Sequence, residues 1–157
     1  MDIKLVNNLF LFFGLMILAK EDHESCLISN KKLSVLAIFK LTSDILSILH
    51  SYSFDRPAMG PALRDLYLRL LLAFTVTLIL FLLAILMPEA LGMGDVKLIG
   101  TLVLYLGPAA LLLMALSFIL LLSRAALLKL RKVKIDKLPL APFVFAAFII
   151  FLMLIYI

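Results

Sequence analysis

The sequence predicts an all-α integral membrane protein, a bundle of six transmembrane helices of which one is short. The first observation behind this prediction is composition: 65% of the 157 residues are hydrophobic and the mean hydropathy is +1.20, whereas soluble domains contain roughly 45–50% apolar residues. The second is that the apolar residues form long runs separated by short polar segments. No soluble domain of useful size remains outside these runs, so we treat residues 1–157 as a single membrane-embedded domain.

The charge pattern supports a membrane protein and argues against nucleic-acid binding. The formal net charge is +5, but the Lys and Arg residues lie between apolar runs and form no basic face interleaved with aromatic residues. Cations in such positions are typical topology signals. The single cysteine, Cys26, excludes an internal disulfide and a cysteine-based metal cluster. We therefore expect the lipid bilayer as a partner, and neither a nucleic-acid partner, a metal nor a cofactor.

The first two predicted helices cover residues 5–19 and 33–50. The first could be a signal peptide, but residues 19–21 lack the small-residue cleavage pattern, so we expect a membrane span. The second carries four polar residues on one helical face, Lys40, Ser43, Asp44 and Ser47. That stripe faces the interior of a bundle if the helix crosses the membrane, or marks a helix lying in the interface. Lys40 and Asp44 are expected to pair, because they are four residues apart.

Residues 52–61 contain several Gly and Pro residues and predict a loop. The apolar run at 66–87 predicts the third span, which Pro88 ends.

The next apolar run, residues 96–128, is too long for one span. As a single helix it would be about 50 Å long, against a hydrocarbon core of about 30 Å. Because Gly107 and Pro108 interrupt it, we predict a short helix at 96–106 and a full span at 108–128. The sixth span begins at residue 138.

The positive-inside rule predicts the orientation of these spans in the cytoplasmic membrane. The connection between the fifth and sixth spans is the most cationic, with Lys129, Arg131, Lys132, Lys134 and Lys137, and is therefore expected on the cytoplasmic side. Counting back two crossings places Asp95 on that side, and two further crossings place Asp22 there. The prediction requires residues 33–50 to cross. Arg56, Arg64 and Arg69 then lie on or near the outer side, which is a mild objection.

Asp22 and Asp95, each at a junction between a loop and an apolar helix, are the candidate catalytic residues. Two carboxyls that approach closely share a proton, so that one can deprotonate a water while the other donates to a peptide carbonyl. This chemistry is aspartyl proteolysis, and the sequence does not say which member is the base. Simpler roles remain open: Asp95 could cap the helix expected from residue 96, and Asp22 belongs to an acidic patch with Glu21 and Glu24.

Three further residues near Asp95 are candidates for substrate binding. Gly92 and Gly94 lack side chains, so an extended substrate backbone can approach them closely, although both could instead form a flexible linker. Lys97 could contact the substrate, or could extend to lipid phosphates.

The stretch Gly92-Met93-Gly94-Asp95-Val96-Lys97-Leu98 resembles the GxGDxKL motif of the type IV prepilin peptidases, membrane aspartyl proteases related to archaeal preflagellin peptidases. Two other segments support the resemblance. Ile28-Ser29-Asn30 follows Asp22 at the distance at which the family has Ile-Pro-Asn, with serine in place of proline. Residues 138–143, Leu-Pro-Leu-Ala-Pro-Phe, are similar to an IPFGPF-like segment that opens the family's last helix.

The resemblance implies an activity and a substrate. Asp22 and Asp95 would be the catalytic pair, and Gly92, Gly94 and Lys97 would shape the loop that faces the substrate. The substrate would be a prepilin-like or pseudopilin precursor, with a short basic leader that ends in Gly and precedes a hydrophobic helix, cleaved at the cytoplasmic membrane edge. Larger members carry an amino-terminal, cysteine-rich region associated with methylation. This chain has no such region, so we expect a short form without methylation.

Two alternatives remain at this point, and the sequence does not indicate the oligomeric state. A member of the same family could cleave preflagellins or competence pseudopilins. A non-enzymatic transport or assembly component could use Asp44 and Asp95 for ion coupling or helix packing, although the third, fifth and sixth spans offer almost no ionisable residues.

Overall fold

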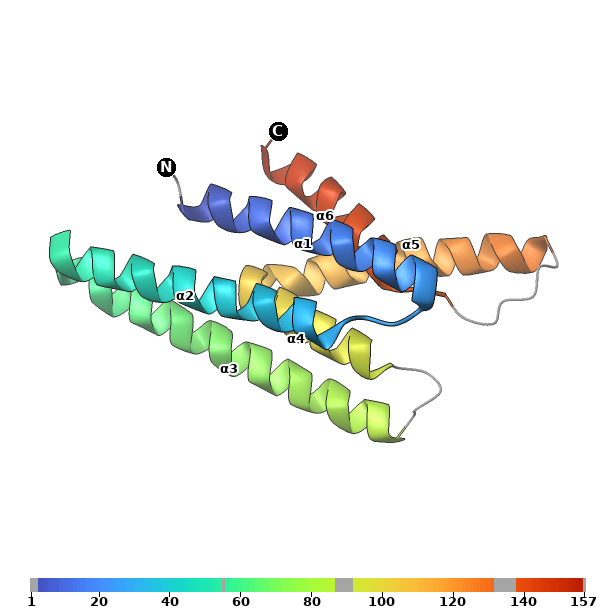
Figure 1. The fold of residues 1–157 in the computed structure, drawn as a ribbon, viewed down its shortest axis with the longest axis horizontal. Helices are drawn as coiled ribbons and strands as arrows, with labels where there is room; N and C mark the ends of the chain where they lie inside the picture. Colours follow the sequence, from blue (N-terminus) through green and yellow to red (C-terminus); the bar gives the residue numbers. More distant parts are fainter. Residues whose placement is uncertain (1–2, 55, 87–91, 132–137, 157) are drawn as a thin grey trace.

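The computed structural model describes residues 3–54, 56–86, 92–131 and 138–156, and this part of the chain forms six helices and no strand. Figure 1 shows the helices in chain order: α1 (Ile3–Ser25), α2 (Asn30–Phe54), α3 (Arg56–Leu86), α4 (Met93–Leu106), α5 (Ala109–Leu130) and α6 (Ala141–Tyr156). The predicted all-helical class is confirmed.

Five of the helices form a closed ring around the core. Each of α1, α2, α4, α5 and α6 contacts the next, and α6 returns to α1, while α3 packs against α2 and α4. Helix α4 is central, and eight of its fourteen residues are buried. The core between these helices is aliphatic, with fully buried Leu15, Leu98, Leu102, Val144 and Phe148.

Within the described residues, three helices are long and apolar enough to cross a membrane: Asn30–His50 in α2, Gly60–Leu86 in α3, and Ala109–Leu130 in α5. Much of the apolar surface of α3 and α5 is exposed, as expected where lipid surrounds a helix. Helix α4, at 14 residues, is about 21 Å long and shorter than the hydrocarbon core. A short helix was predicted here. In α6 the apolar stretch Ala141–Leu154 is also short.

The polar stripe of α2 is buried or half-buried against its neighbours, which is the first of the two arrangements predicted for it. Lys40 is only 3% exposed, and its Nζ donates a hydrogen bond to Asp44, as predicted. The same ammonium lies 5.9 Å from the centre of the Tyr105 ring in α4. Antiparallel packing of α1 against α2, marked by the stacked rings of Phe10 and Phe39, completes this side of the ring.

The predicted loop at residues 52–61 is wrong, because α2 continues to Phe54 and α3 begins at Arg56. Pro57 lies in the first turn of α3, where a backbone N–H has no partner within the helix and its loss costs nothing. Pro61 lies further inside and removes one hydrogen bond near the helix end. Residues 87–91, after the predicted third span, and 132–137, in the predicted cationic connection, lie outside the described residues.

Candidate active site

Asp22 and Asp95 come together where three helix ends meet. The last turns of α1 and the first turns of α4 and α6 lie at the same end of the bundle (Figure 1). Asp22 is 4% exposed in the last part of α1, and Asp95 is half-buried in the first turn of α4. The negative charge of Asp22 contributes to raising the pKa of Asp95, so the two carboxyls interact although they are far apart in the sequence.

Asp22 is held by the amino-terminal end of α6. The backbone N–H of Ala141 donates a hydrogen bond to Oδ2 of Asp22 at 2.9 Å, and the N–H of Leu140 donates as well. The N–H groups of a first helical turn have no partner within the helix and attract anions. The next residue, Pro142, has no N–H, and Phe143 donates to the carbonyl of Leu140. Asp22 therefore satisfies the buried N–H at the start of α6.

Asp95 turns back toward the beginning of its own helix. Helix α4 begins at Met93 with Gly92 as its N-cap, so Asp95 lies inside the first turn rather than before the helix, as a cap at residue 96 would require. The Gly92 N–H donates to the Asp95 carboxylate, and a Cβ on Gly92 would lie 3.3 Å from Oδ2 of Asp95. The predicted role of Asp95 as the cap of a helix from residue 96 is therefore wrong, because Gly92 is the N-cap and Asp95 is the third residue of α4.

Both carboxyls lie outside the apolar stretches 5–19 and 96–106, and both have raised pKa values. Burial raises the pKa of Asp95 from 3.8 to about 6, with a second contribution from the charge of Asp22 and an opposing one from the Gly92 N–H. Burial also raises the pKa of Asp22, against the N–H groups of Ala141 and Leu140 and the nearby His23. The protonation of the two carboxyls is therefore coupled, because the charge of Asp22 opposes ionisation of Asp95.

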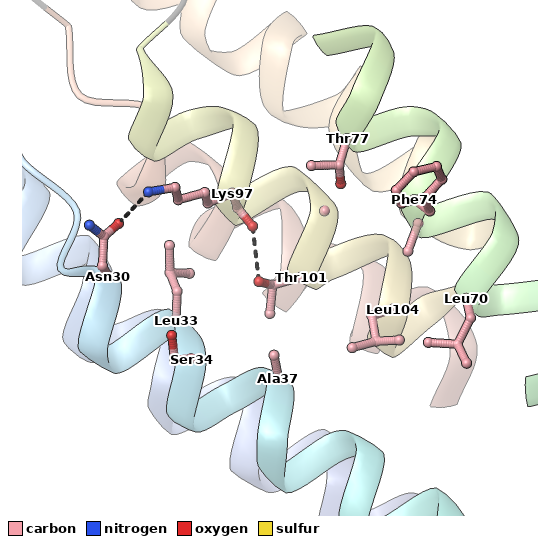
Figure 2. Close-up of a pocket in the computed structure, with 12 residues that line it drawn as sticks. Asn30, Leu33, Ser34, Ala37, Leu70, Phe74, Thr77, Lys97, Thr101 and Leu104 are labelled. Carbon is pink, nitrogen blue, oxygen red and sulfur yellow. Dashed lines mark hydrogen bonds between the residues drawn. The ribbon is translucent and has the colours of Figure 1, made fainter. Parts of the chain in front are cut away.

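The turn between α1 and α2 packs directly on the glycine-containing motif. A Cβ on Gly94 would lie 3.2 Å from Cβ of Ile28, so the missing side chain lets the turn approach α4. Figure 2 shows that Nζ of Lys97 donates a hydrogen bond to Oδ1 of Asn30, at 2.9 Å. Ile28 and Asn30 are the residues that resemble the family's Ile-Pro-Asn. Contacts thus join two of the segments that carry the resemblance, this turn and the stretch 92–98, while the start of α6 contacts Asp22.

Lys97 faces away from the two carboxyls. Two residues along a helix rotate the side chain by about 200°, which directs Lys97 toward α2 and α3. There it lies at one end of a groove of about 470 Å³ between α2, α3 and α4. The walls of the groove include Leu33, Phe74 and Leu104 (Figure 2). Any contact of Lys97 with a substrate would therefore occur in this groove, and not beside Asp95.

The sequence pointed to Asp22 and Asp95 as candidate residues, but not to the hydrogen-bond donors that contact Asp22. The hydrogen bonds from Ala141 and Leu140 to Asp22 come from backbone groups, which leave no residue-type signal. Pro142 marks the start of a helix, and a buried carboxylate is a natural partner for such an end. The contact between Lys97 and Asn30 spans 67 residues, and no local pattern predicts it.

No family model, curated protein or solved structure matched this chain in the comparisons with known proteins.

Proposed function

We propose that this chain is a membrane-embedded aspartyl endopeptidase that removes the short leader from prepilin-like precursors. The observation that carries the proposal is the interaction of the Asp22 and Asp95 carboxyls at the junction of α1, α4 and α6. Two interacting carboxyls with raised pKa values, one buried and one half-buried, are the groups that aspartyl proteolysis requires.

The chemistry follows from one proton shared by two carboxyls. The ionised member removes a proton from a water molecule, whose oxygen attacks the carbonyl carbon of the scissile peptide. The protonated member donates its proton to the carbonyl oxygen, which gives a tetrahedral diol. One diol hydroxyl then returns its proton to the ionised member, the leaving nitrogen accepts a proton from the dyad, and the C–N bond breaks.

The hydrogen bonds assign the two roles in our proposal. Asp22 accepts N–H groups from Ala141 and Leu140, and such donors favour a carboxylate over a carboxylic acid. Asp95 interacts with the charge of Asp22 and has a pKa of about 6. Asp22 therefore acts as the base that activates water, and Asp95 as the acid that protonates the carbonyl oxygen.

The proposal includes six membrane crossings with both carboxyls at the cytoplasmic face. It is supported by the length and apolar character of α2, which the orientation argument requires to cross, and by the exposed cations Lys129 and Arg131 at the end of α5. A precursor cleaved there would place its hydrophobic helix in the bilayer. The apolar groove beside Lys97 offers a surface for side chains of that helix.

The alternative of ion coupling through Asp44 and Asp95 receives less support. Asp44 pairs with Lys40 on its own helix, and Asp95 interacts with Asp22 instead. If the substrate is a preflagellin or a pseudopilin, the same two carboxyls act and only the identity of the precursor differs.

The test is leader cleavage of a co-produced prepilin-like precursor, followed by mass spectrometry of its amino terminus. We expect Asp22→Asn and Asp95→Asn to abolish cleavage while both proteins remain in the membrane. The matched control is Asp65→Asn, which removes a carboxylate that pairs with Arg69 in α3 and should leave cleavage intact. Cleavage by either dyad variant would overturn the assignment. Absence of cleavage by the unaltered chain, over a panel of pilin, preflagellin and pseudopilin precursors, would reject the activity.

A further inference from the structure

A second groove lies between α1 and α2, away from the two carboxyls. Its volume is about 270 Å³, and its apolar walls include Phe13, Gly14 and Ile17 from α1 and Val35 from α2. Gly14 sets its shape, because a Cβ there would overlap the side chain of Leu36. Phe13, Ile17 and Val35 are about half exposed, so this apolar surface is open to its surroundings.

The charge in this groove is confined to one end. Lys31 and Lys32 line it and belong to the first turn of α2, whose free N–H groups add positive potential. Lys32 pairs with Glu21 at 3.1 Å, whereas Lys31 forms an ion pair with no carboxylate in the part of the chain that the structure describes. The opposite end lies near Phe10, which stacks on Phe39 about 12 Å further along α2.

We propose that this groove binds one acyl chain of an anionic phospholipid, with the phosphate paired to Lys31 and Lys32. A phospholipid has the same order of parts as the groove: charge at the membrane surface, then hydrocarbon toward the bilayer centre. Basic pockets between membrane helices recognise anionic headgroups in this manner. The inference does not depend on the proposed peptidase activity.

The charge of the groove favours a phospholipid over an apolar partner helix, because Lys31 and Lys32 line one end of it and the rest of the wall is apolar. The positive end also selects among lipids, because a phosphatidylcholine headgroup carries its own cation and a phosphatidylglycerol headgroup does not.

Native mass spectrometry of the purified full chain, titrated with phosphatidylglycerol or phosphatidylcholine, tests the proposal. We expect the unaltered chain to bind phosphatidylglycerol more tightly. The double variant Lys31→Gln, Lys32→Gln should weaken that binding by about 5- to 30-fold, because each lysine near a charged headgroup strengthens binding by about fivefold. The same variant should change phosphatidylcholine binding less than twofold. The matched control, Lys129→Gln with Arg131→Gln, removes two exposed cations of α5 and should have no such effect.

A second variant tests the groove without touching its charge. Val35→Phe fills the groove, and Leu46→Phe places the same aromatic side chain at an exposed position of α2 that does not line it. We expect only Val35→Phe to lower lipid binding, with helix content unchanged in circular dichroism. The proposal would be overturned by equal binding of both lipids, or by equal effects of the two charge variants. It would also be overturned by equal effects of the two phenylalanine variants, or by a dimer that forms without lipid.

Discussion

Replacing Asp95 with asparagine should stabilise the protein at neutral pH while it abolishes cleavage. Burial and the charge of Asp22 raise the pKa of Asp95 from 3.8 to about 6 in the folded chain. The folded state therefore holds this proton more tightly than the unfolded state, and the free energy of unfolding falls as pH rises from about 4 to about 6. Above about pH 6 the contribution of this proton to the free energy of unfolding is fully lost. An asparagine at this position carries no charge, so its folded state has no such loss.

The size of the effect follows from the shift in pKa. A shift of about two units corresponds to about 3 kcal/mol at 1.36 kcal/mol per unit. Because Asp95 is partly exposed, solvent screening reduces this value, and we expect Asp95→Asn to gain about 1–2 kcal/mol at pH 8. In a chain of this size that gain corresponds to a rise in thermal midpoint of about 2–8 °C.

Thermal unfolding in detergent at pH 8 and pH 4.5 measures this prediction. At pH 4.5 the Asp95 carboxyl is mostly protonated in the folded protein, so most of the gain should disappear. Asp65→Asn serves as the control, because its carboxylate is exposed and paired with Arg69. A variant that is no more stable than the parent at pH 8, or equally stabilised at both pH values, would show that the buried charge of Asp95 is not the source of the effect.

Three further outcomes are expected at the same end of the bundle. The free energy of unfolding of Asp22→Ala should be about 1–3 kcal/mol lower than that of Asp22→Asn, because only asparagine can still accept the buried Ala141 N–H. Equal stabilities of the two variants would contradict this contact. Gly94→Val should reduce both stability and cleavage, because its side chain would displace Ile28, and Ile28→Ala should partly restore both if that contact is the cause. Cys26 is exposed and should react with a membrane-impermeant maleimide in inverted vesicles but not in intact cells; the reverse pattern would refute the cytoplasmic orientation.

The sequence was most informative where a residue's role depends on its own helix. Apolar runs predicted the positions of the helices, Gly107 and Pro108 predicted the break between α4 and α5, and the spacing of Lys40 and Asp44 predicted their pairing. One exception was the segment 52–61, where proline counted as a helix breaker although the first turn of a helix tolerates it. Another was Asp22, which was predicted at a junction between a loop and a helix but lies inside α1, because the helix continues through the polar residues to Ser25.

The sequence did not predict contacts between segments that are far apart in the chain. Topology could assign Asp22 and Asp95 to one side of a membrane, but their interaction depends on how α1, α4 and α6 pack. Backbone N–H groups of Leu140 and Ala141 are chemically the same in every sequence, so their contact with Asp22 required the fold.

The hydrogen bond from Ala141 to Asp22 has a consequence for biosynthesis. Asp22 is synthesised before its hydrogen-bond donor, because α6, which contains Ala141, follows α1 in the chain. Until α6 has inserted, the carboxylate lacks this partner and the ring of helices is open. On our proposal, the catalytic pair is therefore complete only after α6 has joined the bundle.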